Sequence, residues 1–576
     1  MNAYNWIKSV PFSEFEFRIS GLAGLEGRMN LEGFTPYNPE DAEKYTQFRW
    51  WPGLTFGDML DKAADIYPDK EAFVDGKSRL TFSQARQKVD RLAISMMELG
   101  IKPLTRVLVQ IPNWNEFAYA YLSMQKIGAI PVLLIDRYRQ HEINHLVQLT
   151  GATTWIVPER YKKIDYMPII RDVLKNNPNM ANIILVRGTE HEGCLNMEKL
   201  IDRAELSKDN LDKLVDRRPD PDQVAHMGPT GGTTGLPKVA PRTHNSMLCS
   251  AEYAARAWDV EGSDICLLAG PIGHDLTFTK GFCASILTKG KTVFLDSTDA
   301  DDICRTIEAE KVTAVVWVPT LANRLVNFER LQDYDLSSLK KMHCGGGASL
   351  PDLIKGVREK LHCNFFNGYG GTEGQTCLTR SMDDTETILH TVGKPTCPYD
   401  IYKVVDRNGQ ELPLNAPGEL LIKGPGIFTG YYNAPDENKK VFDKDGFFRT
   451  GDVAKVDEAG NIALTGRMKE MINRGGESIS ATEIEKLISS HPDVALVAVV
   501  PMPDPVMEEK ACAYIQPMPR AELDFDTIIA FLKDNKASVL QFPERIEFTD
   551  AMPLTQTGKL DKRALIEDIR VKIGIL

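Results

Sequence analysis

The sequence predicts an α/β protein with more than one domain. The chain has 576 residues, which is too long for a single hydrophobic core. Residues 81–175 alternate short apolar segments with segments of helical spacing, the pattern of a mostly parallel sheet covered by helices. Residues 482–533 repeat this alternation on a smaller scale, which indicates a second, smaller α+β domain at the C-terminal end.

The expected elements follow from this alternation in chain order. Helices are expected over residues 83–99, 115–127, 141–149, 482–491 and 525–533. Strands are expected over residues 107–111, 130–134, 154–157, 224–227, 265–269, 292–295, 314–318 and 495–500. Residues 158–220 are more strongly charged and are expected at the periphery, whereas glycine and proline punctuate short strands beyond residue 391 and predict a β-rich subdomain.

Composition narrows the functional classes. Hydrophobic residues make up 43% of the chain and charged residues 26%, as in a soluble globular protein. The net charge of −12 and the lack of a basic block argue against nucleic-acid and membrane-surface partners. The ten cysteines form no CxxC pair, which favours reduced thiols. No apolar run approaches the length of a membrane span, and the first residues show no signal-peptide pattern. We therefore expect a cytoplasmic protein.

The stretch Thr230–Lys238 reads TGGTTGLPK and predicts a loop that grips a polyphosphate. Glycines let backbone N–H groups turn toward an anion, threonine hydroxyls add donors, and lysine adds positive charge. A plain turn between strands is the alternative, but turns seldom need so many donors. The stretch is not a Walker loop; the nearest such site, at Gly290, has Ser285 in place of the first glycine and is expected to be a turn.

Further motifs follow in order along the chain. They are HD at residues 274–275, GGG at 345–347, NGYGGTEG at 367–374, VGKP at 392–395, GEL at 418–420, GYYN at 430–433, RTGD at 449–452, GRMKE at 466–470 and TGK at 557–559. With the phosphate loop, this series resembles the adenylate-forming superfamily of acyl-CoA synthetases, luciferases and adenylation domains of peptide synthetases. TGGTTGLPK followed by PRTHN is most similar to the aryl-acid-activating branch, such as the dihydroxybenzoate–AMP ligases. The resemblance covers residues 35–570.

The resemblance implies a set of ATP- and AMP-binding residues. Tyr369 offers a ring face to adenine, Thr372 a hydroxyl to the α-phosphate, and the carboxylate of Asp452 accepts from the ribose hydroxyls. The full set is Thr230, Gly231, Gly232, Thr233, Thr234, Gly235, Lys238, Gly346, Gly347, Asn367, Gly368, Tyr369, Gly370, Thr372, Asp452, Arg467 and Lys559. Thr230 and Glu373 are the implied Mg²⁺ ligands, because Mg²⁺ prefers oxygen donors.

Lys559, Glu373 and His274 are the implied catalytic residues. A lone lysine in a Thr-Gly-Lys loop is ordinarily a solvated surface residue, so only the family position gives Lys559 a catalytic role. A lone histidine is likewise ordinarily a hydrogen-bonded structural residue. In the family, the lysine offsets the negative charge that builds up when a carboxylate attacks the α-phosphorus of ATP.

The implied acyl-binding residues are His274, Asp275, Gly347 and Gly371. Asp275 departs from the dihydroxybenzoate branch, which has asparagine there to pair with the ring 2-hydroxyl. The aspartate is compatible with an amino group on the substrate, with a hydroxyl, or with a carboxylate tied to another protein group. A small aryl or cyclic acid is the first expectation and an amino acid or amino-substituted acid the second.

The resemblance also implies a small domain that rotates against the rest of the chain. Residues 1–35 are an extension of unknown role, residues 36–466 form the AMP- and acyl-binding domain, and residues 467–576 form a small mobile domain. Lys469 occupies the hinge position, and Gly475, Gly476 and Glu477 line the thiol tunnel.

The expected function is an AMP-forming acid–CoA ligase that uses ATP, Mg²⁺ and CoA, as a monomer or homodimer. The first alternative is an adenylating enzyme that loads the phosphopantetheine of a separate carrier protein. A luciferase-type oxygenase and a non-catalytic nucleotide-binding protein remain further alternatives, although the presence of Lys238, Glu373, Asp452 and Lys559 weighs against the latter.

Overall fold

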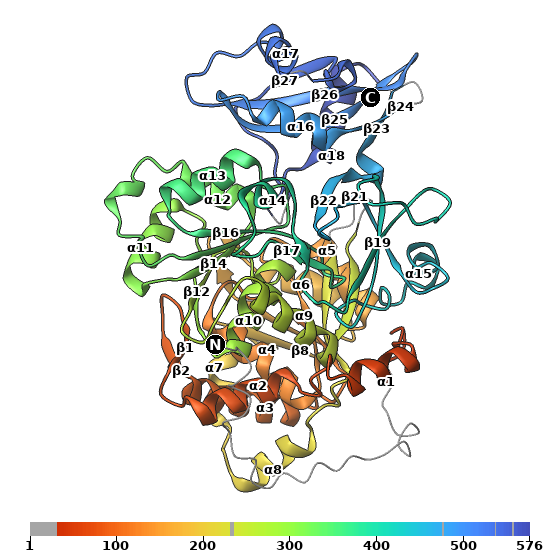
Figure 1. Cartoon of the computed structure of the whole chain (residues 1–576). Coiled ribbons are helices and arrows are strands. Elements are labelled where there is room, and N and C mark those ends of the chain that lie inside the picture. Colours follow the sequence, from red (N-terminus) through yellow and green to blue (C-terminus); the bar gives the residue numbers. More distant parts are fainter. Residues whose placement is uncertain (1–30, 231–235, 475–476, 536, 556–557, 576) are drawn as a thin grey trace, which may run out of the picture.

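The computed structural model describes residues 31–230, 236–474, 477–535, 537–555 and 558–575. The predicted site residues Gly231, Gly232, Thr233, Thr234, Gly235, Gly475 and Gly476 therefore lie outside the described residues. Figure 1 shows a large body, red to teal, and a smaller blue domain above it. This arrangement confirms the predicted α/β class with a large and a small domain.

One sheet of the large body has seven strands in the described part of the chain. In spatial order they are β11 (Lys238–Thr243), β10 (Val224–Thr230), β4 (Ile130–Leu133), β3 (Arg106–Val109), β5 (Thr154–Pro158), β8 (Asn182–Val186) and β9 (Leu195–Asn196). The pairs are parallel except β10 with β11, which form a hairpin across the predicted phosphate loop. The loop therefore starts at the carboxyl end of β10.

A second sheet of the large body has nine strands among the described residues. Their order is β18 (Lys394–Pro395), β17 (Thr376–Leu378), β16 (Asn364–Gly370), β15 (Lys341–Cys344), β14 (Ala314–Trp317), β12 (Ile265–Leu268), β13 (Lys291–Phe294), β1 (Glu71–Val74) and β2 (Arg79–Thr81). The six strands from β16 to β1 pair in parallel, as a doubly wound sheet requires.

Helices cover both faces of these sheets. Between the sheets lies one core, formed by the buried faces of amphipathic helices and by α4 (Asn115–Ile127), α9 (His244–Ala257) and the π-helix η2 (Leu276–Cys283), which are buried over most of their surface. The other helices of this core are α2 (Phe56–Ile66), α3 (Phe82–Glu98), α5 (Gln140–Thr150), α6 (Met167–Asn176), α7 (Met197–Arg203), α8 (Lys208–Asp216) and α10 (Ala284–Thr288). A second core lies under α11 (Ala300–Glu310), α12 (Pro319–Val326), the short η3 (Leu331–Asp333), α13 (Pro351–Lys360) and α14 (Thr385–His390).

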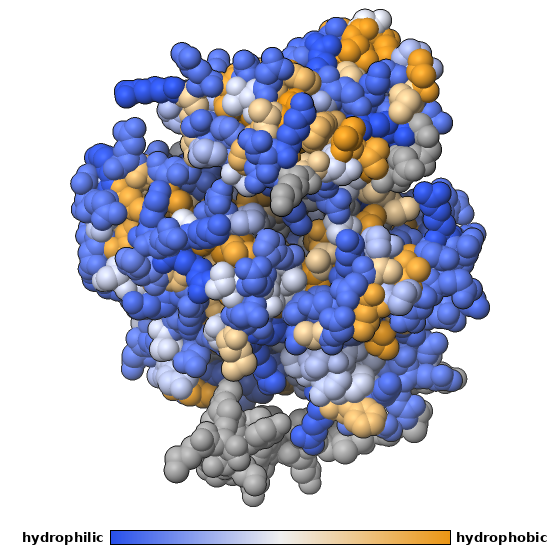
Figure 2. Space-filling view, turned by 45° about the horizontal axis from the view of Figure 1, so that its top comes forward, coloured by the Kyte–Doolittle hydropathy of each residue, from blue (hydrophilic) through white to orange (hydrophobic). Residues whose placement is uncertain are grey.

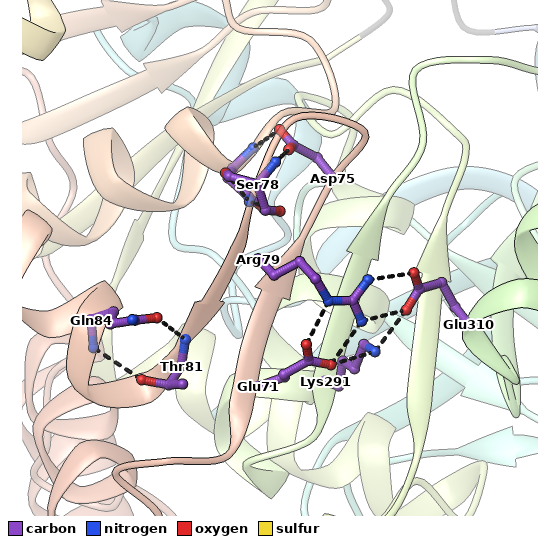
Figure 3. Close-up of polar contacts among 9 residues, drawn as sticks. Glu71, Asp75, Ser78, Arg79, Thr81, Gln84, Lys291 and Glu310 are labelled. Atoms are coloured by element: carbon purple, nitrogen blue, oxygen red, sulfur yellow. Dashed lines mark hydrogen bonds and ion pairs between the residues drawn. The ribbon is translucent and has the colours of Figure 1, made fainter.

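A charged network fixes the outer edge of the nine-stranded sheet (Figure 3). The guanidinium of Arg79 bonds Glu71 at 2.6 Å and Glu310 at 2.7 Å, and the ammonium of Lys291 bonds the same two carboxylates at 2.7 Å each. The network joins β1, β2, β13 and α11. In the same view, Thr81 and the side chain of Gln84 form a capping box that starts α3.

The predicted β-rich subdomain is a four-stranded antiparallel sheet in the described residues. Its strands are β19 (Ile401–Val405), β20 (Gly418–Lys423), β21 (Phe448–Val456) and β22 (Ile462–Arg467), with α15 (Pro435–Val441) beside them. Residues 31–35, which belong to the expected extension, pack on this side of the body with α1 (Pro39–Gln47). The backbone of Asn433 donates to the Gly33 carbonyl at 3.1 Å, and Leu31 is buried in the main core.

The small domain is a sheet with helices on both faces. Its described strands are β24 (Glu477–Ser480), β23 (Met471–Arg474), β26 (Glu508–Pro517), β25 (Val494–Asp504) and β27 (Arg545–Phe548). One core lies under α16 (Ala481–Ser489) and α17 (Phe525–Asp534), and another under α18 (Lys562–Lys572). The short turns η4 (Met468–Glu470) and η5 (Val539–Gln541) complete the elements.

Predicted and observed elements agree within a few residues, with one correction. The expectation that residues 158–220 are peripheral is wrong for β8, because four of its five residues are buried between β5 and β9. Figure 2 shows hydrophilic side chains over most of the visible face, with scattered apolar patches on the small domain. None of the described helices is long and apolar enough to cross a membrane.

Candidate nucleotide and acyl site

A cavity of about 1710 Å³ lies between the large body and the small domain. The strands β10, β15 and β16 point their carboxyl ends at it, which is where ligands bind in open α/β sheets. Sixteen of the predicted residues line it. They are Thr230, Lys238, His274, Asp275, Gly346, Gly347, Asn367, Gly368, Tyr369, Gly370, Gly371, Thr372, Glu373, Asp452, Arg467 and Lys559.

Tyr369, Asp452 and Arg467 form one hydrogen-bonded group. The Tyr369 hydroxyl donates to Asp452 Oδ2 at 2.5 Å, and Arg467 Nε lies 2.8 Å from Asp452 Oδ1. The register of β21 and β22 places Asp452 opposite Arg467. Burial raises the pKa of Asp452 above its ordinary value, against the opposing charge of Arg467. The buried carboxylate is thus held beside the cavity by two donors.

Glu373 and Lys238 are fixed through the GYYN segment. The Tyr431 hydroxyl donates to Glu373 Oε1 at 2.7 Å, and the ammonium of Lys238 lies 4.6 Å from the centre of the Tyr431 ring. Lys238 also pairs with Glu437 at the start of α15. The Glu373 carboxylate thus contacts the hydroxyl of Tyr431, and the Lys238 ammonium lies over the ring of the same tyrosine.

Lys559 reaches the cavity from the small domain. Its Cε atom lies 3.3 Å from the position that a Cβ on Gly346 would occupy, so a side chain at Gly346 would crowd the lysine. Gly346 also has a φ of +80°, which favours glycine. Thr320 holds the Lys559 loop by donating to the Gly558 carbonyl at 3.0 Å. Burial, and next the charge of Arg467, lower the pKa of Lys559.

His274 lies in the turn between β12 and the π-helix η2, two residues before η2 begins. Its Nδ1 accepts from the backbone N–H of Leu276 at 3.4 Å. Burial lowers the pKa of His274 from 6.5 to about 4, and the charge of Lys559 acts in the same direction. The imidazole is therefore neutral at pH 7.

Asp275 forms an ion pair inside the protein, the third of the possibilities that its sequence position allows. Lys280 Nζ lies 2.7 Å from Asp275 Oδ2, and the Thr279 hydroxyl donates to Asp275 Oδ1 at 2.6 Å. Burial alone would raise the pKa of Asp275, but the charge and hydrogen bond of Lys280 outweigh it and hold that pKa below its ordinary value. Both carboxylate oxygens thus have protein partners.

The glycines and Asn367 shape the cavity wall. A Cβ on Gly371 would lie 2.7 Å from Glu373 Oε2, so glycine lets the carboxylate lie against the backbone. A Cβ on Gly368 would lie 2.6 Å from Nε2 of His343 on β15. The amide of Asn367 donates to the Thr391 carbonyl at 2.9 Å, which anchors the strand end.

The backbone of two residues expected near the hinge and thiol tunnel, Lys469 and Glu477, belongs to described elements. Lys469 belongs to the turn η4 between β22 and β23, and Glu477 begins β24, paired with Arg474. The flanking residues Met468 and Glu470 line the cavity. The side chains of Lys469 and Glu477 lie outside the described part of the chain.

The cavity residues that sequence reasoning missed include Lys280, His343, Tyr431 and Glu437. Lys280 had a signal, since it is the charged residue in the otherwise uncharged segment LTFTKGFC, five positions after Asp275. Tyr431 lies in the recognised GYYN motif. His343 and Glu437 carried no local signal, because their role depends on contacts across the fold.

Comparison with known proteins follows the same division into two parts. Residues 60–432 match the model of the AMP-binding enzyme family, and residues 483–559 match the AMP-binding enzyme C-terminal domain. The chain therefore belongs to the AMP-binding enzyme family.

Three curated relatives match nearly the whole chain. The 2,3-dihydroxybenzoate-AMP ligase of Bacillus subtilis (strain 168) is 34% identical and covers 94% of this chain and 99% of its own. A Streptomyces sp protein, salicylyl-CoA synthase / salicylate adenylyltransferase, is 32% identical with the same coverage. The salicyl-AMP ligase / salicyl-S-ArCP synthetase of Mycobacterium tuberculosis (strain ATCC 25618 / H37Rv) is 31% identical, over 94% of this chain and 96% of its own.

Among solved structures, the apo structure of Mycobacterium smegmatis MbtA is similar, with a TM-score of 0.70 and 30% identity. It covers 93% of this chain and 98% of that one.

Proposed function

We propose that the chain adenylates a small aryl acid with ATP and passes the aryl group to the phosphopantetheine thiol of a separate carrier protein. The observation that carries the first step is the position of Lys559. It enters from a second domain, against Gly346, into a cavity that Glu373, Asp452 and His274 also line. A cation that a second domain supplies at this cavity suits a reaction in which two anions must meet.

In the first step the substrate carboxylate attacks the α-phosphorus, the bond to the β-phosphate oxygen breaks, and pyrophosphate leaves. We assign Lys559 to the charge on the α-phosphate and Lys238 to the leaving phosphates. Tyr369 offers its ring to adenine, while Asp452, held by Tyr369 and Arg467, accepts from the ribose hydroxyls. Neutral His274 shapes the path of the carboxylate.

The donor set suits a magnesium ion that ATP brings with it. Glu373 presents one carboxylate at the cavity, with Oε1 bonded to Tyr431, and Thr230 offers a hydroxyl at the end of β10. The described residues contain no cluster of three metal-ligating side chains. This is compatible with Mg²⁺, which ordinarily takes one or two carboxylates together with substrate phosphates. When bound, Mg²⁺ would neutralise phosphate charge; we assign Glu373 and Thr230 to hold it.

In the second step a thiol attacks the acyl carbon, the C–O bond to the phosphate breaks, and AMP leaves. The sequence favoured CoA as acceptor, but the relatives support a carrier protein better, since one is named for a salicyl-S-ArCP product and another for an aryl-AMP product. CoA is the second candidate, favoured by the relative named salicylyl-CoA synthase.

We also propose that the small domain turns about Lys469 between the two steps. Lys469 lies in the turn η4, where the last strand of the large body, β22, gives way to the first strand of the small domain, β23. A rotation there would withdraw Lys559 and bring residues 475–477 toward the cavity.

Mass spectrometry tests the proposal. The protein is incubated with ATP, Mg²⁺ and a panel of aryl, cyclic, aliphatic and amino acids, each with no thiol, with CoA, or with a holo carrier protein. We expect an aryl-adenylate that persists with CoA and disappears with the carrier. A CoA thioester would instead select the second candidate, and no adenylate from any acid would refute adenylation.

A further inference from the structure

The acyl side of the cavity contains a charged pair in an apolar setting. The side chains of Asp275 and Lys280 are 8% and 3% exposed, and both line the cavity. Asp275 directly precedes η2 and Lys280 lies within it, beside the buried Leu276, Phe278 and Phe282 of the same segment. Removing two charges from water is costly, and the attraction between them often only offsets this cost. Hydrophobic residues would fill the same space more cheaply, so the pair points to a ligand.

The hydrogen bonds of the pair leave donors in excess. A lysine ammonium has three N–H donors. In the described part of the chain one of them is bonded to Asp275 Oδ2, at 2.7 Å. Asp275 has a partner on each oxygen, Lys280 on one and Thr279 on the other. The buried group that can still form hydrogen bonds is therefore the Lys280 ammonium, a positively charged donor.

A neighbouring strand adds a second group that can still form a hydrogen bond. His343 on β15 lines the same cavity and is 2% exposed, and its Nδ1 has no hydrogen-bond partner among the described residues. Burial, and next the charge of Lys280, lower the pKa of His343 to about 3, so the ring is neutral. The charge of the Lys280 ammonium thus acts on the His343 imidazole, and both groups line the same cavity.

We propose that Lys280 determines acid specificity by donating a hydrogen bond to an oxygen or ring-nitrogen acceptor on the aryl ring of the substrate. This rests on the proposed adenylation function. Asp275 acts as a positioning residue, because its carboxylate holds the ammonium of Lys280. The substrate class is then hydroxy-, oxo- or aza-aryl acids.

The same arrangement disfavours amino acids and amino-substituted acids. An ammonium group on the substrate would meet the positive charge of Lys280, and the carboxylate that would bind it is already paired with Lys280. An aromatic amine would direct its N–H donors at another donor. Amino-substituted acids, the second expectation from the sequence, are therefore the competitors against which this proposal is tested.

The variants must avoid leaving one buried charge alone, since breaking a buried pair is strongly destabilising. The paired variant Asp275→Asn/Lys280→Met removes both charges and keeps the side-chain lengths. The single variant Thr279→Val removes one hydrogen bond to Asp275 and leaves Lys280 in place. Lys102→Met, at an exposed position, is the matched lysine control.

The measurement is acid-dependent ATP–pyrophosphate exchange with benzoate, the three hydroxybenzoates, the three pyridine carboxylates and the three aminobenzoates. The quantity compared is kcat/KM relative to benzoate. We expect the wild type to prefer at least one hydroxybenzoate or pyridine carboxylate by about 10–100-fold, as for a buried hydrogen bond to a charged group. The paired variant should reduce this preference to within about threefold, whereas Lys102→Met and Thr279→Val should retain it.

Failure of this inference and failure of the proposed function give different results. An unchanged preference in the paired variant, or a wild type that prefers an aminobenzoate to its hydroxy isomer, would overturn the role of Lys280 while leaving adenylation established. Exchange with none of the acids, in a protein that still binds ATP by calorimetry, would overturn the proposed function, and this inference with it.

Discussion

The two halves of the cavity are built in different ways. On the nucleotide half, sequence motifs contact one another: Tyr369 donates to Asp452, 83 residues further along the chain, and Asp452 pairs with Arg467 on the neighbouring strand. On the acyl half, Asp275 finds its partners within one turn of η2, in Thr279 and Lys280, and these lie outside any motif. Several motifs together form the nucleotide half, whereas the charged pair of the acyl half forms within one segment of the chain.

This difference has a physical basis. ATP presents the same base, ribose and phosphates to every enzyme that uses it. The chemistry of ATP therefore limits which residue types can bind it. The acid differs between enzymes, and a fold can host many substrates by changing a few side chains. A change on the nucleotide half should therefore affect all acids alike, and a change on the acyl half should alter the ranking of acids.

Lys559→Ala should have the largest effect. We assign Lys559 to the charge on the α-phosphate, which is present whichever acid reacts. We expect adenylation to fall by about 10²–10³-fold for every acid, as when one electrostatic contact to a transition state is lost. ATP–pyrophosphate exchange measures this step, with Lys533→Ala on α17 as the exposed control in the same domain. The variant should still convert supplied aryl-adenylate to thioester. Equal losses in both half-reactions would refute the assigned role.

Lys469→Pro should separate the two steps. Proline fixes φ and removes an N–H, which restricts the backbone at the proposed hinge in η4. We expect near-normal adenylation and a loss of about 10²-fold in thioester formation, the scale of effect that mispositioned reactants produce. Single-turnover assays of each half-reaction measure both. Normal thioester formation would exclude a hinge at Lys469.

Asp452→Asn should weaken ATP binding without changing the ranking of acids. The amide keeps one acceptor but loses the charge that Arg467 and Tyr369 complement. We expect the KM for ATP to rise by about tenfold, the effect of one hydrogen bond to a charged group. The control is Asp445→Asn, on an exposed turn of the same subdomain. If the preference among acids changed as much as the KM for ATP, the two halves would not be separable.

The same division explains what the sequence could predict. Periodicity and motif order located the sheets, the β-rich subdomain and the nucleotide residues, because each signal is short-range or shared by a family. The strand β8 was hidden by the charged residues around it, although its run Ile183, Ile184, Leu185 and Val186 is typical of a buried parallel strand.

The acyl half could be predicted only in part. The sequence singled out Asp275 but left its partner open, because a π-helical segment that brings Lys280 to the carboxylate has no simple periodic signal. His343 joins this wall through the parallel pairing of β15 with β14 and β16, which brings together residues distant in the chain. Such contacts follow from the tertiary structure.

The smallest expected effect is that of mild acid on acid selectivity. Burial lowers the pKa of His274 to about 4 and that of His343 to about 3, and Lys280 holds the pKa of Asp275 below its ordinary value. None of these three groups changes its charge between pH 7.5 and 5.5. The ratio of kcat/KM for a hydroxybenzoate and for benzoate should therefore vary by less than about twofold over this range.

Stability should respond to the same pH change. Burial lowers the pKa of His226, His244 and His343 to about 3, so at pH 5.5 the unfolded chain binds protons at these positions that the folded protein does not. Stability from neutral, buried histidines is present above pH 6.5 and is lost as the pH falls below it, by about 1 kcal/mol per residue at pH 5.5. The thermal midpoint should fall while the selectivity ratio stays level. If acid selectivity instead changed with a midpoint near pH 6.5, a titrating histidine would have to act on the acyl half. The Asp275–Lys280 pair, which does not titrate in this range, could then not account for selectivity alone.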